Sequence, residues 1–480
     1  MLFNSLDFLI FFPVIVGLYF ALSPKYRWVL LLGASYYFYM CWKAEYIILI
    51  VFSTLVDYFA AGQMARIQEK KKRRPFLYLS LLSNLGLLFF FKYWNFFSGE
   101  TRALLDSWNI MVDVPTFQLL LPVGISFYTF QTLSYTIDVY NGKLEPEKNL
   151  GRFALYVSFF PQLVAGPIER ATHLLPQLRK TFDFDYQRVV SGLQQMLWGF
   201  FKKVVIADRL AVYVNEIYAS PGDENGLALL LATYFFAFQI YCDFSGYSDI
   251  AIGAARVMGY DLMENFRTPY LSRSIREFWS RWHISLSTWF RDYLYIPLGG
   301  NRVPQVRWFL NLFIVFVVSG FWHGANWTFL IWGALHGSYL VAEILWKRLP
   351  FAQFKGIPTR LKNILSIGIT FHLTLLAWVF FRANSLGDAI TVIRSVVELP
   401  LTLSVEMIRE TINQAGGLTW LVTAFILVLF VFADPVMDKA IKKLRSGKSI
   451  SYAFGIFASI LSGIIILGYF GEVEFIYFQF

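Results

Sequence analysis

Long apolar runs recur along nearly the whole of this 480-residue chain. A helix needs about 20 apolar residues to cross a bilayer. The runs cover roughly residues 3–22, 28–42, 45–62, 76–97, 117–140, 226–258, 308–346, 361–382, 417–433 and 453–470. Those at 226–258 and 308–346 exceed one crossing, and the second predicts a helical hairpin. We therefore expect an all-α polytopic membrane protein. No internal repeat or Pro/Ser-rich linker divides it, which predicts one integral-membrane domain over residues 1–480.

Composition supports the membrane assignment and excludes an ordinary soluble protein. Hydrophobic residues make up 57% of the chain and charged residues only 15%, too few for a water-exposed surface of this size. The opening stretch, "MLFNSLDFLIFFPVIVGLYFAL", lacks a basic leader and a small-residue cleavage site, so it predicts a retained first helix. Cys41 and Cys242 are too few for a disulfide framework.

The distribution of basic residues predicts an orientation in the membrane. "ARIQEKKKRRP" (65–75) and "DKAIKKLRSGK" (438–448) are strongly basic, and such loops concentrate on the cytoplasmic side. Counting back through the predicted crossings places the N-terminus outside, and the last crossing leaves the tail "FGEVEFIYFQF" outside as well. The formal net charge of +10 is accounted for by such loops, so no nucleic-acid partner is expected.

The stretch from Phe266 to Arg307 differs from the rest. It holds seven arginines, no lysine and two acids, Glu277 and Asp292, with aromatic residues between them. This composition favours helices in the membrane interface. Two interpretations stay open: positive-inside charge with an aromatic belt, or a cytoplasmic vestibule for a phosphorylated ligand, since arginine pairs phosphate bidentately. Candidate donor-binding residues here are Arg281, Trp282 and Arg291.

A shorter stretch, "SFFPQLVAGPIER" (158–170), mixes proline and glycine into an apolar run and predicts a re-entrant segment.

Few residues in the apolar segments carry chemistry. Asp243 and Asp249 lie in "YCDFSGYSDIAIG" (241–253), where polar pairing between helices is favoured over catalysis. The five histidines, His173, His283, His323, His336 and His372, show no metal-ligand spacing. We expect His336 and His372 to be packing residues and His173 to lie in a loop.

His323 in "SGFWHGANWTF" (319–329) is the strongest candidate. A helix from Trp308 to Trp322 would be ~22 Å long at ~1.5 Å per residue, whereas the hydrocarbon core is ~30 Å thick. Gly320 and Gly324 flank the histidine, and Asn326 begins the return. The turn is thus expected inside the membrane, where an ionisable residue is a functional candidate by default. The alternative is a histidine hydrogen-bonded into the packing.

Several long blocks of the chain resemble the membrane-bound O-acyltransferase family. The strongest are "FWSRWHISLSTWFRDYLYIPLGGNR" (278–302) and "GFWHGANWTFLIWGALHG" (320–337). Others are "LPVGISFYTFQTLSYTIDVY" (121–140), "FFPQLVAGPIER" (159–170), "CDFSGYSDIAIG" (242–253) and "VFFRANS" (379–385). The resemblance is closest to the bacterial alginate O-acetylation branch and more distant to the D-alanyl transferases.

This resemblance implies a ring of tilted transmembrane helices around a central funnel, with re-entrant and interfacial helices, in the inner membrane of a bacterium. His323 matches the family's catalytic histidine, and His283 matches a second functional position. The resemblance also implies acetyl-CoA as a cytoplasmic co-substrate, with no permanently bound cofactor. It further implies an extracytoplasmic SGNH-type or related transferase as partner and a polysaccharide as final acceptor.

The residues and the resemblance together predict a reaction. Neutral His323 would accept the proton of an acceptor hydroxyl as it attacks the thioester, and His283 would bind or polarise the donor. Asn326 is a candidate to orient His323 or to contact the donor. The alternatives are D-alanyl transfer from a carrier protein, a transporter in which His323, Asp243 and Asp249 relay protons, and a scaffold subunit that needs no imidazole.

Overall fold

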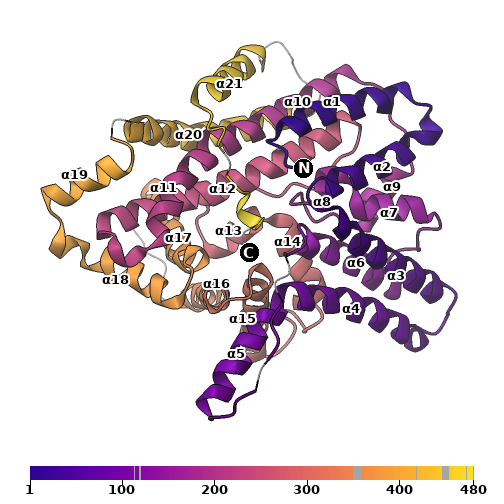
Figure 1. Ribbon diagram of the computed structural model, residues 1–480, viewed down its shortest axis with the longest axis horizontal. Helices are drawn as coiled ribbons and strands as arrows, with labels where there is room; N and C mark the ends of the chain where they lie inside the picture. Colours follow the sequence, from indigo (N-terminus) through magenta and orange to yellow (C-terminus); the bar gives the residue numbers. More distant parts are fainter. Residues whose placement is uncertain are drawn as a thin grey trace. The chain divides into compact units, whose positions relative to one another are not determined.

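The computed structural model describes residues 1–112, 114–117, 120–349, 358–417, 419–445, 453–471 and 473–478. Within these ranges the chain is helical and contains no β-strand, as the apolar runs predict (Figure 1). It divides into two compact units, Met1–Met196 with Ile250–Met263, and Leu197–Asp249 with Glu264–Phe480. The single domain over residues 1–480 stays a prediction.

Six helical segments of the described chain are long and apolar enough to cross a membrane. They are Ala44–Arg66, Lys70–Ser107, Gly226–Val257, Gln305–His323, Trp327–Trp346 and Thr359–Arg382. The 226–258 run forms one helix, α12 (Gly226–Val257), and the 308–346 run forms the predicted hairpin of α15 (Gln305–His323) and α16 (Trp327–Trp346). The protein is therefore a multi-pass integral membrane protein.

The first unit is built from the N-terminal helices. They are α1 (Leu6–Ala21), α2 (Arg27–Met40), α3 (Ile47–Ala65), α4 (Arg74–Leu88), α5 (Trp94–Ser107), α6 (Ile125–Tyr140), α7 (Leu150–Ser158), α8 (Phe160–Leu163), α9 (Ala171–Leu178) and α10 (Tyr186–Phe200), which ends in the second unit. The "SFFPQLVAGPIER" stretch becomes the end of α7, the single turn of α8 and an irregular segment. The predicted break in regular helix is present there.

Helices α3, α4 and α6 pack together (Figure 1), and a buried carboxylate joins them. Asp57 on α3 is fully buried and accepts hydrogen bonds from Ser80, from Asn84 Nδ2 at 2.9 Å and from Thr136 Oγ1 at 3.2 Å. Lipid offers no such donors, so polar groups on apolar helices pair with each other. This network joins the three helices.

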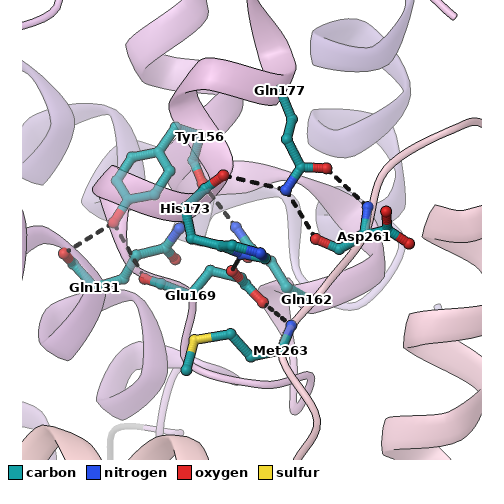
Figure 2. A network of polar contacts seen from close by, with 8 residues as sticks. All are labelled: Gln131, Tyr156, Gln162, Glu169, His173, Gln177, Asp261 and Met263. Carbon is teal, nitrogen blue, oxygen red and sulfur yellow. Dashed lines mark hydrogen bonds and ion pairs between the residues drawn. The ribbon is translucent and has the colours of Figure 1, made fainter.

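A second buried carboxylate, Glu169, organises the segment around α9 (Figure 2). Its Oε2 lies 2.7 Å from Nδ1 of His173, and its Oε1 accepts the backbone N–H of Met263. Gln177 reinforces the same link, since its side chain donates to the Asp261 carbonyl at 2.9 Å and accepts the Asp261 N–H at 2.8 Å. His173 itself lies within helix α9, so the prediction that it lies in a loop was wrong. Nothing in its local sequence shows its Glu169 partner to be buried.

The second unit holds α11 (Asp208–Ala219), most of α12 and the remaining helices. These are α13 (Ile275–Arg281), α14 (Ile284–Phe290), α15, α16, α17 (Thr359–Arg382), α18 (Leu386–Thr402), α19 (Val405–Gln414), α20 (Thr419–Arg445) and α21 (Ala453–Leu467). Side-chain caps begin several of them: Ser274 accepts the N–H of Glu277, and Ser385 accepts that of Asp388.

Glycines allow α15 and α16 to pack closely side by side (Figure 1). A Cβ on Gly320 would lie 2.2 Å from the carbonyl oxygen of Phe329, and one on Gly333 would lie 2.3 Å from that of Phe316. Both clashes are with backbone atoms, which cannot rotate away. Small residues at such crossings let helix backbones approach in membranes. The hairpin therefore requires glycine at both positions.

Replacing Gly333 by alanine tests this packing. We expect Gly333→Ala to destabilise the protein by about 1–3 kcal/mol, the usual result of overpacking. The measurement is thermal unfolding in detergent. Gly368→Ala on α17 is the matched control, because a Cβ there meets nothing within 4 Å. Equal melting temperatures for the two variants would contradict the packing argument.

The Glu169–His173 pair predicts a pH dependence. Burial raises the pKa of the Glu169 carboxyl, and the hydrogen bond to Glu169 raises the pKa of His173. Folded His173 therefore holds its proton at a pH where unfolded histidine, with a pKa near ~6.5, has lost it. Its stabilisation is complete below ~6.5 and is lost as the pH rises through the raised value.

We accordingly expect His173→Gln to flatten the fall in thermal stability between about pH 6 and pH 8. The difference should be at most about 1 kcal/mol, since His173 is half-exposed and solvent screens the pair. His372→Gln serves as control, because His372 contacts Tyr234 and the Gly368 carbonyl and, among the described residues, no carboxylate. If thermal stability fell with pH as steeply in His173→Gln as in wild type, the Glu169–His173 pair would not bind its proton more tightly in the folded state.

Candidate active site

Two buried histidines of the second unit lie next to each other. His283 immediately precedes α14, and His323 is the last residue of α15. Their ring centroids are 6.3 Å apart, and their exposed fractions are 0% and 4%. The fold therefore brings together the two histidines that the sequence singled out, across 39 residues of intervening chain.

The turn at His283 is held in an uncommon backbone conformation. His283 has φ 43° and ψ 54°, in the left-handed region that non-glycine residues rarely adopt. Asn265 supports this turn, since its carbonyl accepts the N–H of Ile284 at 2.9 Å and its Oδ1 accepts the Ser285 hydroxyl at 2.9 Å. Strain of this kind persists only where the surroundings over-determine it. The His283 side chain is thus aimed by the neighbouring polar residues.

The surroundings of His283 are aromatic. The ring of Phe244 stands edge-on to it at 4.6 Å, and that of Phe266 stacks at 6.5 Å. Burial among these rings holds the pKa of His283 well below its ordinary value. The imidazole therefore stays neutral at physiological pH, with one nitrogen as donor and the other as acceptor.

His323 sits at the end of its helix against three further aromatic rings. Trp322, Trp332 and Phe381 lie with ring centroids 4.9, 5.0 and 5.4 Å from it. Helix α15 begins at Gln305, three residues before the predicted start, and its 19 residues span ~28 Å. This is close to a ~30 Å hydrocarbon core, so the predicted length shortfall was wrong. Aromatic packing, rather than helix length, keeps His323 away from solvent.

The C-terminal tail supplies a third residue that sequence reasoning missed. Tyr477 lies with its ring centroid 5.8 Å from that of His323 and 6.2 Å from that of His283, and it packs on Phe244 at 4.4 Å. Its neighbours Phe475 and Ile476 are buried. The sequence predicts this tail only as a segment outside the membrane after the last crossing, and that side stays a prediction; its contact with the two histidines is what the sequence did not indicate. Four aromatic residues among the last six were the available signal.

This arrangement suits proton transfer in a dry environment. A neutral imidazole can accept a proton from a hydroxyl or donate one to a developing oxyanion. Excluding water strengthens each of these interactions, because the local dielectric is low. Two imidazoles and a phenol within one aromatic enclosure can therefore act as base, donor and positioning group for attack on a carbonyl carbon.

The residues predicted to bind the donor differ in their exposure to solvent. Arg281 and Arg291 reach the surface in part, and each pairs with an acid, Glu277 at 2.5 Å and Asp292 at 2.8 Å. Trp282 is buried and stacks on Phe278 with a centroid distance of 5.5 Å. Its part in donor binding stays a prediction.

Asn326 caps α16 by accepting the Thr328 N–H at 3.0 Å and donates to the Asn384 carbonyl at 3.2 Å. Its predicted role toward His323 or the donor stays a prediction. Trp289 and Phe290, which lie between the arginines, are buried inside the unit, and the helices of the membrane interface expected here stay a prediction.

The remaining polar candidates pair within the chain. Asp243 and Asp249 of α12 form ion pairs with Lys203 and Lys202, at 2.8 and 2.5 Å. His336 is buried and accepts a hydrogen bond from Trp279 Nε1 at 3.3 Å. The structure thus separates His336, a packing histidine in the same hairpin, from the His283–His323 pair.

Comparison with known proteins places this geometry in a family. The model for "MBOAT, membrane-bound O-acyltransferase family" matches residues 147–383, which include both histidines. The chain is 40% identical to the probable alginate O-acetylase AlgI of Pseudomonas aeruginosa, over 94% of this chain and 86% of the relative. It is 37% identical to a peptidoglycan O-acetyltransferase of Helicobacter pylori, over 79% of this chain and 75% of the relative.

A more distant relative carries a different acyl group. The teichoic acid D-alanyltransferase of Bacillus subtilis is 28% identical over 56% of this chain and 71% of its own length. The O-acetyltransferases match at higher identity and over more of the chain. With the His283–His323 pair buried in its second unit, this multi-pass chain belongs to the membrane-bound O-acyltransferase family and is an O-acetyltransferase.

Proposed function

We propose that the protein transfers an acetyl group from cytoplasmic acetyl-CoA through a membrane funnel to an extracytoplasmic hydroxyl, with His323 as general base. The observation that supports this most directly is the pair of buried imidazoles, 6.3 Å apart, within an aromatic enclosure. Relatives that match most of the chain are named for O-acetylation of alginate and peptidoglycan. The final acceptor is accordingly a cell-surface or exported polysaccharide.

The proposed chemistry balances without a metal or a redox cofactor. The acceptor oxygen attacks the thioester carbonyl as His323 takes its proton. The carbon–sulfur bond of the tetrahedral intermediate then breaks, and the CoA thiolate leaves with the proton that His323 held. His283, which burial keeps neutral, donates an N–H to the carbonyl oxygen as negative charge develops there.

The donor enters from the cytoplasmic side in this proposal. The basic segments 65–75 and 438–448 lie on that side, the N-terminus lies outside, and the membrane is the bacterial inner membrane. Arg281 and Arg291 exchange their present partners, Glu277 and Asp292, for the phosphates of acetyl-CoA. An extracytoplasmic SGNH-type or related transferase carries the acetyl group on to the polysaccharide.

Acetyl is the proposed acyl group because the O-acetylating relatives share more of the chain than the D-alanyl transferases do. Offering labelled acetyl-CoA and a D-alanyl carrier protein separately to purified protein in proteoliposomes distinguishes the two donors. Turnover of only the carrier protein would overturn the choice of acetyl-CoA.

Removing the proposed base tests the mechanism. We expect His323→Gln to lower acetyl transfer by about 10²–10⁴-fold, the usual contribution of a positioned base. The measurement is label transfer from acetyl-CoA in proteoliposomes with the partner transferase present. His336→Gln is the matched control, because it changes a buried histidine of the same hairpin that lies outside the pair.

Two outcomes would overturn this assignment. A wild-type rate in correctly folded His323→Gln would exclude His323 as the base. Accumulation of a solute in the vesicles without any acetyl transfer would instead favour a proton-coupled transporter.

Tyr477 gives a separate prediction. Its ring lies beside both imidazoles, so its hydroxyl belongs to the polar groups of an otherwise apolar enclosure. We expect Tyr477→Phe to lower transfer about tenfold or more, which corresponds to ~1.4 kcal/mol, about the size of one lost hydrogen bond.

The control for Tyr477→Phe removes the same oxygen from a buried tyrosine elsewhere in the second unit. Tyr213→Phe does so, since its hydroxyl faces the Ala228 carbonyl at 3.5 Å. Full activity of Tyr477→Phe would show that the ring alone matters at this position.

A further inference from the structure

A buried cluster of charges lies where the backbone departs from regular α-helix. The π-helical segment Phe201–Ala207 joins α10 to α11 and carries Lys202 and Lys203, both buried. Lys203 Nζ lies 2.7 Å from Asp208 Oδ1 and 2.8 Å from Asp243 Oδ1. π-Helical turns are rare and frequently lie at functional sites. Burying three charges is costly, so the cluster calls for an explanation beyond packing.

The C-terminal tail is attached to this same cluster. Asp243 uses its second oxygen, Oδ2, to accept the backbone N–H of Ile476 at 2.9 Å. Lys203 Nζ lies 5.9 Å from the ring centroid of Phe475, within the range of a cation–π contact. One carboxylate therefore links a buried lysine to the residue that directly precedes Tyr477.

Two more hydrogen bonds connect the residues just before the tail to the same helices. The carbonyl of Val204, within the π-helical segment, accepts the N–H of Tyr469 at 2.8 Å. Arg209 on α11 donates to the carbonyl of Leu467 at 2.7 Å. The tail is thus held at both ends of its course by one short stretch of chain and by Asp243.

We infer that Lys203 and Asp243 are positioning residues for acyl transfer, because together they hold the tail so that Tyr477 lies against His283 and His323. This inference rests on the proposed function. The ion pair fixes the Asp243 carboxylate, the carboxylate fixes the Ile476 amide, and the amide fixes the adjacent Tyr477. Displacing a group by about 1 Å in such a site can lower a rate by about 10²-fold.

The cluster provides its own matched control. Asp208 and Asp243 both pair with Lys203 at nearly equal distance, and both are buried. Of the two, Asp243 also contacts the tail, through Ile476. A purely electrostatic role for the cluster would make the two aspartates equivalent, whereas a positioning role makes Asp243 the sensitive one.

The experiment compares Asp243→Asn with Asp208→Asn in full-length protein in proteoliposomes. Acetyl transfer from labelled acetyl-CoA gives kcat and KM, and thermal unfolding reports folding. We expect Asp243→Asn to lower kcat about tenfold or more with KM for acetyl-CoA within about twofold, and Asp208→Asn to stay within about threefold of wild type. Equal losses in both variants would overturn the inference.

A second readout follows the tail itself and does not depend on catalysis. Phe478→Cys in a Cys41→Ser background places a thiol on the tail and leaves Cys242, which is buried, as the other cysteine of the chain. We expect Asp243→Asn to raise its rate of reaction with a membrane-permeant maleimide about tenfold, in line with a released segment, and Asp208→Asn to leave it unchanged. If wild-type protein transferred no acetyl group, the proposed function would fail while this readout still tested the tail.

A third variant removes the donor and leaves the ion pair intact. Ile476 begins the short helical turn Ile476–Phe478, a position where proline is tolerated because its missing N–H is not needed within the turn. Ile476→Pro should reproduce the kcat loss and the faster labelling of Asp243→Asn, while Ile476→Val should match wild type. Faster labelling with full transfer activity would show that the tail's position does not matter for the reaction.

Discussion

Lipid provides no hydrogen-bond partners, so every polar group that this chain buries must find its partner within the chain. Asp57, Glu169 and Asp243 each satisfy this constraint through donors on other helices or on distant backbone. Each pairing therefore joins segments that the sequence separates widely. The same constraint makes the enclosure of His283 and His323 suitable for catalysis, because water cannot compete there for the imidazoles.

Much of the helical framework and the two histidines could be predicted from the sequence. Run length is a local property, and it correctly indicated the hairpin of 308–346. For 226–258 it indicated only a length beyond one crossing, and the structure shows one long helix there. His323 is indicated by its position in an apolar run, His283 by the blocks that resemble the family, and the structure places the two together. Helix starts were less predictable: α15 begins at Gln305 because residues before Trp308 continue the helix despite their polarity.

What the sequence did not reveal depends on contacts between distant segments. The partners of His173 and Asp57 are buried by other helices, and no local pattern reports that. Asn326 lies three residues after His323, and the cap that it forms on α16 is a contact that its spacing alone did not indicate. Trp282 lies among arginines as an interface residue would, but burial of a large aromatic surface in the interior prevails.

Tyr477 shows why the chemistry depends on the complete fold. The site draws on the turn before α14, the end of α15 and the last few residues of the chain. A tail with mostly apolar side chains gains burial by returning into the unit, but burial alone is non-directional and sets no register. The Asp243–Ile476 hydrogen bond fixes the register of the tail, because a hydrogen bond is directional and this one requires the backbone N–H of one particular residue. A buried charge kept at some cost to stability can therefore be explained by the register that it imposes on an aromatic segment.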